Sequence, residues 1–272
     1  MFISAIILGI IEGLTEFLPI SSTGHLILAN RWLSFEGHFA AVFDVVIQVG
    51  AVFAVVLYFR RELFPMSFAL EERRRFISLW SRILAAFAPA VVIGLLLDDW
   101  IEAHLFHPLT VALALIVGAV WMFVVERSRR APTVVDVRAI GWRQAVLVGF
   151  AQCLAMWPGF SRSAATILGG MTLGLSRTAA AEFSFFLAVP TLAGAAALKL
   201  MKEIIRLMRE GVSLGVDEWL AIGVGTLVSF LVAYFVIAFF MRYIRTRSLV
   251  PFAVYRIALG LLILGVLARQ SL

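Results

Sequence analysis

The chain has 272 residues, of which 62% are hydrophobic and 15% are charged, and its mean hydropathy is +1.00. This composition excludes an ordinary soluble domain and indicates an integral membrane protein. The net charge is +6, but the basic residues stand in short segments between apolar runs and form no soluble patch, so we expect no nucleic-acid partner.

Apolar runs long enough to cross a hydrocarbon core of ~30 Å recur along the whole chain. We therefore expect an all-α integral membrane protein, organised as a single domain over residues 1–272 and surrounded by membrane lipids. The sequence predicts six transmembrane helices, at about 39–59, 79–97, 108–125, 179–200, 219–241 and 250–268. Two further apolar segments, 1–34 and 144–176, are interrupted by Pro, Gly and Ser.

Charges between the spans predict the orientation. Arginines gather after the first, third and fifth spans, at 60–75, 127–143 and 242–247, whereas 98–107 contains acidic residues and no Lys or Arg. The arginine-rich segments should therefore face the cytoplasm. Basic residues at 202–209 fall in a predicted outer loop, where we expect an amphipathic interfacial helix. With this orientation, 1–34 and 144–176 each begin and end on one side, which predicts two re-entrant helical hairpins.

The two halves of the chain resemble each other weakly. In each half, a broken segment with Pro and serines precedes a span that opens on an acidic residue, Asp44 or Glu182. We expect an inverted-topology repeat, with one copy at about 1–125 and the other at about 144–268. Repeats of this kind place a binding site at the interface between the copies, near the middle of the bilayer.

The first polar segment, EGLTEFLPISSTGH, covers residues 12–25. Glu12 and Glu16 are four residues apart, so on a helix they share one face. Paired carboxylates favour a hard divalent cation, Mg²⁺ or Ca²⁺. An amphipathic helix with both carboxylates in solvent is the alternative, and the apolar residues on both sides argue against it.

Hydroxyl groups follow Pro19, which should end the first helix. Ser21, Ser22 and Thr23 precede a new helix that we expect to begin at about residues 24–25, where free N–H groups would favour an anion. Capping of that helix is the alternative, but it requires one hydroxyl and not three. His25 could serve as a general base for a serine, as a general acid, or as a hydrogen-bond donor to phosphate.

The second polar segment, WPGFSRSAAT, covers residues 157–166. A buried arginine suits a bidentate oxyanion such as phosphate, so we expect Arg162 to bind phosphate, with Ser161, Ser163 and Thr166 beside it. A structural ion pair between Arg162 and a carboxylate is the alternative. A hydroxyl nucleophile, an imidazole, a cation clamp and a metal held by carboxylates together predict phosphoryl transfer, and the apolar surroundings predict a lipid substrate.

These segments, together with FDVVIQVGAVFAVV and EFSFFLAVP, resemble the signature segments of the bacterial undecaprenyl pyrophosphate phosphatase family (undecaprenyl-diphosphatases), the bacitracin-resistance proteins. The resemblance covers essentially the whole chain. It implies removal of the terminal phosphate of undecaprenyl pyrophosphate, which recycles the lipid carrier for peptidoglycan synthesis. It also implies a multi-pass protein of the bacterial inner membrane whose site opens toward the periplasm and needs a divalent cation.

By the same resemblance, Glu12 and Glu16 form the acidic motif, Ser22 is the nucleophile with His25 as its histidine, and Arg162 binds phosphate. Whether a serine or an activated water attacks is left open, and so is a homodimer. A transporter or flippase of a phosphorylated polyprenyl lipid is the main alternative, because inverted repeats and broken helices are typical of transporters. The phosphatidic acid phosphatase family is excluded because SRSAATILGG lacks the second histidine that this family requires.

Overall fold

The computed structural model describes residues 1–272 except 36, 66, 68, 129–130, 212–213 and 271–272. Within this part the chain is helical, with one isolated bridge between Val134 and Leu175. The elements, in chain order, are α1 (Phe2–Thr15), α2 (Ser22–Trp32), α3 (His38–Tyr58), α4 (Arg60–Leu63), α5 (Leu70–Leu105), α6 (Pro108–Arg127), η1 (Val137–Ala139), α7 (Trp142–Gln152), η2 (Cys153–Met156), α8 (Arg162–Thr172), α9 (Arg177–Glu210), α10 (Val216–Thr246) and α11 (Val250–Gln270).

The six predicted membrane helices are confirmed. Among the described residues, six helices are long and apolar enough to cross a membrane, namely α3, α5, α6, α9, α10 and α11. Three of them are markedly longer than predicted, because α5 covers Leu70–Leu105, α9 continues to Glu210 and α10 covers Val216–Thr246. The prediction of a separate interfacial helix at 202–209 was wrong, since these residues form the last turns of α9. Long charged side chains can keep their charged groups in water while the helix continues, so the charged residues at 202–209 did not mark the end of α9.

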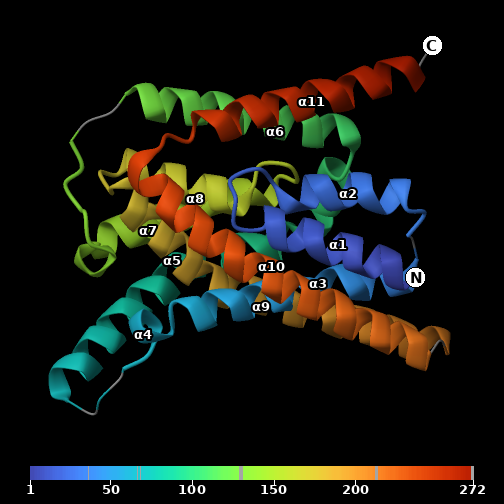
Figure 1. The fold of residues 1–272 in the computed structure, drawn as a ribbon, viewed down its shortest axis with the longest axis horizontal. Helices are drawn as coiled ribbons and strands as arrows, with labels where there is room; N and C mark the ends of the chain where they lie inside the picture. Colours follow the sequence, from blue (N-terminus) through green and yellow to red (C-terminus); the bar gives the residue numbers. More distant parts are fainter. Residues whose placement is uncertain (36, 66, 68, 129–130, 212–213, 271–272) are drawn as a thin grey trace.

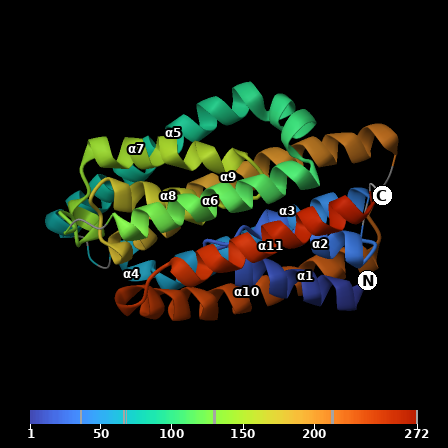
Figure 2. The ribbon, with the colours of Figure 1, turned by 90° about the horizontal axis from the view of Figure 1, so that it is seen from above.

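The start of α1 and the end of α11 lie at the same end of the bundle (Figures 1 and 2). Helix α4 and the C-terminal ends of α6 and α10, where the arginines gather, lie at the opposite end (Figure 1). A chain that crosses a membrane six times ends on the side on which its first span begins, and the six spans agree with this arrangement. Which end faces the cytoplasm stays a prediction.

Two breaks interrupt the apolar segments that lie outside the six spans. The first break, residues 16–21, separates α1 from α2, which returns past α1 (Figure 1). The second break, residues 157–161, separates η2 from α8. Each break contains a proline, Pro19 or Pro158, which has no N–H to donate to a helix. Helix, break and helix thus follow one another where the hairpins were predicted. Their entry from opposite membrane faces, and the inverted repeat, stay predictions.

Close backbone approach holds the broken helices against membrane helices. A Cβ atom on Gly13 of α1 would lie 2.7 Å from the carbonyl oxygen of Ser229 on α10. A Cβ atom on Gly149 of α7 would lie 2.2 Å from the carbonyl oxygen of Ala86 on α5. Only glycine fits at such distances, which is how small residues pack membrane helices together.

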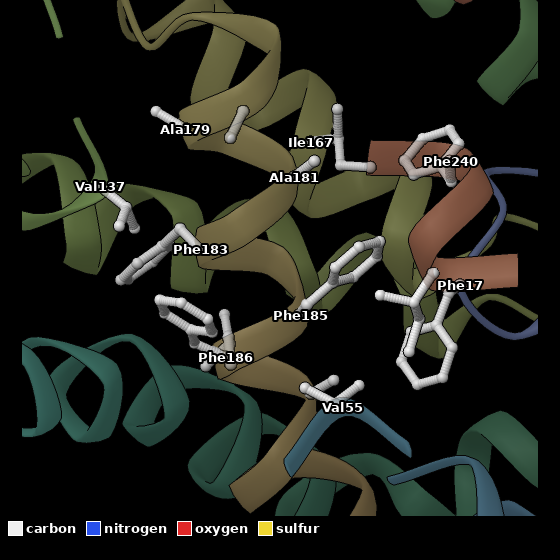
Figure 3. Close-up of a cluster of buried hydrophobic side chains, with 14 of the residues drawn as sticks. Phe17, Val55, Val137, Ile167, Ala179, Ala181, Phe183, Phe185, Phe186 and Phe240 are labelled. Atoms are coloured by element: carbon white, nitrogen blue, oxygen red, sulfur yellow. The ribbon is translucent and has the colours of Figure 1, made fainter. Parts of the chain in front are cut away.

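An aromatic core joins the first break to α9 (Figure 3). Phe17 is fully buried, and its ring meets the edge of Phe185 with centroids 5.3 Å apart and planes at 81°. Such pairs contribute about 0.5–1.5 kcal/mol beyond the area that they bury. Phe186 and Phe240 lie in the same cluster. Because Phe17 directly follows Glu16, this packing fixes the start of the first break.

Candidate active site

The two breaks meet, as predicted from the two polar segments. Arg162 at the start of α8 donates from Nη2 to Oε1 of Glu16 at 3.1 Å. Ser163 donates from Oγ to the carbonyl oxygen of Leu18 at 2.8 Å. Residues that stand almost 150 positions apart in the chain therefore form one polar cluster.

Each break ends on a serine with the same unusual backbone. Ser21 has φ 74° and Ser161 has φ 75°, which is a conformation that costs a non-glycine residue of the order of 1–3 kcal/mol. Each serine caps the helix that follows, because Ser21 Oγ accepts from the N–H of Gly24 at 3.3 Å and Ser161 Oγ accepts from the N–H of Ala164 at 3.2 Å. Strain of this kind concentrates at functional sites.

The hydroxyl of Ser22 has a carboxylate partner. Ser22 Oγ donates to Oε2 of Glu16 at 2.5 Å, and both side chains are buried. Glu16 thus binds Ser22 through one carboxylate oxygen and Arg162 through the other. A hydroxyl held against a carboxylate is the geometry of a nucleophile with its general base.

His25 contacts other groups. Its Nδ1 donates to the carbonyl oxygen of Ser21 at 2.6 Å. Because a carbonyl only accepts, Nε2 of the neutral ring is an acceptor, and the hydroxyl of Tyr255 on α11 donates to it at 2.6 Å. In the structure Ser22 bonds to Glu16, while the ring nitrogens of His25 bond to Ser21 and Tyr255. The catalytic role of His25 stays a prediction, and Tyr255 was missed because its contact joins residues at opposite ends of the sequence.

Arg162 is fixed from three sides. Besides its bond to Glu16, Nη1 donates to the carbonyl oxygen of Ser184 on α9 at 2.9 Å, and the guanidinium lies over the ring of Phe17, 5.7 Å from its centroid. The Nε atom has no hydrogen-bond partner among the described residues, although the side chain is only 9% exposed. An unpaired buried donor is costly, so this atom is available to an incoming acceptor.

The other predicted hydroxyls divide into two groups. Ser21, Thr23 and Ser161 line a cavity beside the two breaks. Ser163 and Thr166 are fully buried and do not line it. Thr166 Oγ1 donates to the carbonyl oxygen of Arg162 at 2.9 Å, so its hydroxyl supports the backbone of the arginine. A contact between substrate and these two residues would require a rearrangement.

That cavity has a volume of about 530 Å³ and both polar and apolar lining residues. Glu16, Ser22 and Arg162 are among the polar ones. Apolar side chains from α5 and α9 also line it, namely Phe87, Val91, Leu95, Leu192, Ala195 and Leu198. A headgroup with several phosphate oxygens and the start of a hydrocarbon chain would match this mixed lining.

Four polar residues of this cavity were missed by sequence reasoning, namely Gln48, Gln152, Thr191 and Lys199. Gln152 is the most informative, since it is 2% exposed and its Nε2 has no partner among the described residues. Its position relative to the second break matches that of Glu12 relative to the first, which was a usable signal. Lys199 stands near the end of a predicted span, where a lysine is ordinary.

Glu12 and Glu16 carry the oxygen ligands that the predicted divalent cation prefers. Glu12 is fully buried, and neither of its carboxylate oxygens has a hydrogen-bond partner among the described residues. A bound cation would supply the partner that these buried oxygens lack among the described residues. No group of three or more His, Cys, Asp or Glu that could hold a metal occurs in the described part of the chain. Mg²⁺ commonly uses one or two carboxylates and takes its other ligands from water and phosphate.

A larger cavity of about 1040 Å³ lies among the C-terminal ends of α6 and α10 and the connection between α8 and α9. It contains none of the predicted site residues. Its Arg177 is paired with the buried carboxylate of Glu126. The smaller cavity is therefore the candidate active site.

Comparison with known proteins identifies the family. The family model described as Bacitracin resistance protein BacA matches residues 5–262. A protein of Thermoanaerobacter sp. (strain X514), named undecaprenyl-diphosphatase, is 46% identical over 271 residues, which cover 99% of this chain and 98% of that protein. Proteins of the same name from Polaromonas naphthalenivorans (strain CJ2) and Deinococcus radiodurans are 47% and 45% identical, over 97% and 98% of this chain and 95% and 96% of theirs. The chain belongs to the Bacitracin resistance protein BacA family.

Proposed function

We propose that this protein is a membrane phosphatase that hydrolyses undecaprenyl diphosphate to undecaprenyl phosphate and inorganic phosphate. The observation that carries the proposal is the hydrogen bond of 2.5 Å from Ser22 to Glu16, beside Arg162 and at the wall of a cavity that is also lined by apolar side chains. The name of the relatives, undecaprenyl-diphosphatase, supports the same substrate. A transporter needs no nucleophile and base, so this pair favours the enzyme over the flippase.

The reaction divides into two displacements at phosphorus. In the first, Glu16 accepts the proton of Ser22 as Oγ attacks the terminal phosphorus, and the bond to the bridging oxygen breaks. Glu16 passes this proton to the departing undecaprenyl phosphate, and the terminal phosphoryl group stays on Ser22. In the second, Glu16 accepts a proton from water as the water oxygen attacks the phosphoserine. The bond between phosphorus and Oγ breaks, Glu16 returns the proton to Ser22 Oγ, and inorganic phosphate leaves. One carboxylate thus serves both steps as general base.

The arginine and the glutamine stabilise the phosphate in this account. Arg162 has an unpaired Nε and Gln152 has an unpaired Nε2 among the described residues, and both residues line the cavity. Donors that are already fixed before the substrate arrives stabilise the charge that spreads over the phosphoryl oxygens in the transition state. Neutral Gln152 adds a donor without adding charge.

The cation and the histidine complete the proposed site. Glu12 is the better metal ligand, since both of its oxygens are free of hydrogen bonds to described residues while both oxygens of Glu16 accept one. When bound, a divalent cation would neutralise negative charge on the diphosphate. His25 would have to exchange its bond with Tyr255 before it could give a proton to a leaving oxygen. We therefore assign the base to Glu16 and keep His25 as a candidate acid.

The charges at the helix ends give the proposed orientation of the protein in the bacterial inner membrane. With the arginine-rich end in the cytoplasm, both breaks enter the bilayer from opposite faces as re-entrant hairpins, and the cavity opens toward the periplasm. The similar backbone conformations of Ser21 and Ser161 support two copies of one repeat within a single domain. A homodimer stays a prediction.

Phosphate release by the purified protein tests the proposal. Undecaprenyl diphosphate in detergent micelles should release one phosphate per molecule and leave the monophosphate. Ser22→Ala should lower kcat by at least about 1000-fold, in the range seen for loss of a nucleophile. Ser81→Ala is the matched control, because that hydroxyl donates to the carbonyl of Ser78 on α5, outside the cavity. Near-normal turnover by Ser22→Ala would overturn the nucleophile, and lipid transfer without phosphate release would favour the flippase.

A further inference from the structure

A buried arginine outside the two polar segments contacts both breaks. Arg256 lies on α11, is 0% exposed, and donates four hydrogen bonds, all to backbone carbonyl oxygens. Nη1 donates to Pro19 in the first break at 3.2 Å, and Nη2 donates to Gly159 in the second break at 3.3 Å. Nε donates to Leu115 and Nη2 also to Ala114, both on α6 and both at 3.1 Å. One guanidinium therefore links both breaks to α6 and α11.

The two carbonyls occupy equivalent positions. Pro19 stands two residues before Ser21, and Gly159 stands two residues before Ser161. Both serines have a φ near 75°. A conformation of this cost persists only where tertiary contacts hold it. Hydrogen bonds from Arg256 to the preceding carbonyls are contacts of that kind, and they act on both breaks at once.

No carboxylate forms an ion pair with Arg256 in the described part of the chain, where its partners are the four carbonyls and the ring of Phe160, 5.9 Å from the guanidinium. A planar, rigid guanidinium can bridge several fixed acceptors, whereas an ammonium group on a flexible stem cannot do so in the same geometry. A buried cation is expensive at membrane depth, so its presence needs a function.

We infer that Arg256 is a positioning residue that sets the register of the two breaks, so that Ser22 from one and Arg162 from the other face the same cavity. The inference rests on the proposed function for its catalytic consequence. Its structural part, the common anchoring of both breaks, is independent of any substrate. Misplacing the reacting groups by about 1 Å is enough to lower a rate by about 100-fold.

A neighbouring glycine allows the guanidinium to be moved without being removed. A Cβ atom on Gly118 of α6 would lie 2.1 Å from Nη2 of Arg256 and 2.9 Å from its Cζ. Gly118→Ala should therefore displace the guanidinium while every charge stays in place. Gly265 on α11 is the matched control, since a Cβ atom there would meet nothing within 4 Å.

The activity test compares these variants with the native enzyme. Arg256→Lys and Gly118→Ala should each lower kcat by about 100-fold, while KM changes by less than about threefold, because the groups that bind phosphate remain. Gly265→Ala should keep native values. Arg177→Lys is a second control, since that partly buried arginine pairs with Glu126 at the far end of α6. Native kcat in both Arg256→Lys and Gly118→Ala would overturn the inference.

Hydrogen–deuterium exchange supplies a readout that does not depend on activity. In Gly118→Ala and Arg256→Lys, backbone amides of residues 16–22 and 157–163 should exchange faster together, with the other helices unchanged. Faster exchange in one break only, or equally throughout the chain, would overturn the common anchor. If Arg256→Lys does not fold, Gly118→Ala decides. If the native protein releases no phosphate, the proposed function fails, and the exchange pattern still tests the anchor.

Discussion

Replacement of Glu16 by glutamine tests the proposed general base with the smallest change of shape. Glu16 accepts from Ser22 at 2.5 Å through Oε2 and from Arg162 at 3.1 Å through Oε1. A glutamine amide has only one oxygen, so one of the two contacts must face an NH₂ group. If the NH₂ group faces Ser22, the hydroxyl can accept but is no longer activated. If it faces Arg162, two donors oppose each other in a buried place.

We expect Glu16→Gln to lower kcat by about 1000-fold, the middle of the range for a general base, which corresponds to about 4 kcal/mol in the activation free energy. The assay is phosphate release over a range of lipid concentrations by purified protein. Glu126→Gln is the matched control, because that carboxylate is also buried and paired with an arginine, Arg177, outside the candidate site. It should change stability and leave kcat within about tenfold of native.

A double variant separates a base from a merely structural carboxylate. If Glu16 acts through Ser22, then Ser22→Ala with Glu16→Gln should be no slower than Ser22→Ala alone, because residues that act as a unit are not additive. Multiplicative losses would mean that Glu16 works independently of Ser22. Glu16→Gln with kcat within tenfold of native would refute the assignment outright.

Three further substitutions test the other parts of the site. Arg162→Lys keeps the charge but loses the planar fork, and we expect kcat/KM for phosphate release to fall by about 100-fold; an unchanged value would show that Arg162 only pairs with Glu16. Glu12→Gln should raise the Mg²⁺ or Ca²⁺ concentration needed for half-maximal activity at least about tenfold, measured by metal titration after chelation; an unchanged metal requirement would remove Glu12 from the metal site. Tyr255→Phe should lower kcat by less than about tenfold, because the proton of Ser22 goes to Glu16; a loss near 1000-fold would place the pair of His25 and Tyr255 in proton transfer.

The sequence was sufficient for the spans because length and apolarity alone define a membrane helix. It was also sufficient for the meeting of the two breaks, since polar groups at membrane depth need one another. Helix ends were less predictable, as α9 shows by continuing through charged residues to Glu210. Both serine N-caps are consistent with the residue types, but their positive φ values depend on contacts from other helices.

Hydrogen-bond partners within the site could not be predicted from spacing. His25 is three residues from Ser22 on the same helix, yet its ring bonds to the carbonyl of Ser21 and to the hydroxyl of Tyr255. Arg256 stood inside a predicted span, and an arginine at such a position is a signal in its own right. Its role could be seen only when Pro19 and Gly159 were placed on either side of it.

The stereochemical course of phosphoryl transfer tests the central claim most directly. A substrate whose terminal phosphorus is chiral through sulfur and oxygen isotopes would be hydrolysed in isotopically labelled water, and the configuration of the thiophosphate product determined. Attack by Ser22 followed by water involves two in-line displacements, each of which inverts phosphorus, so the product should show net retention. Net inversion would mean that water attacks the diphosphate directly and would contradict a phosphoserine at Ser22.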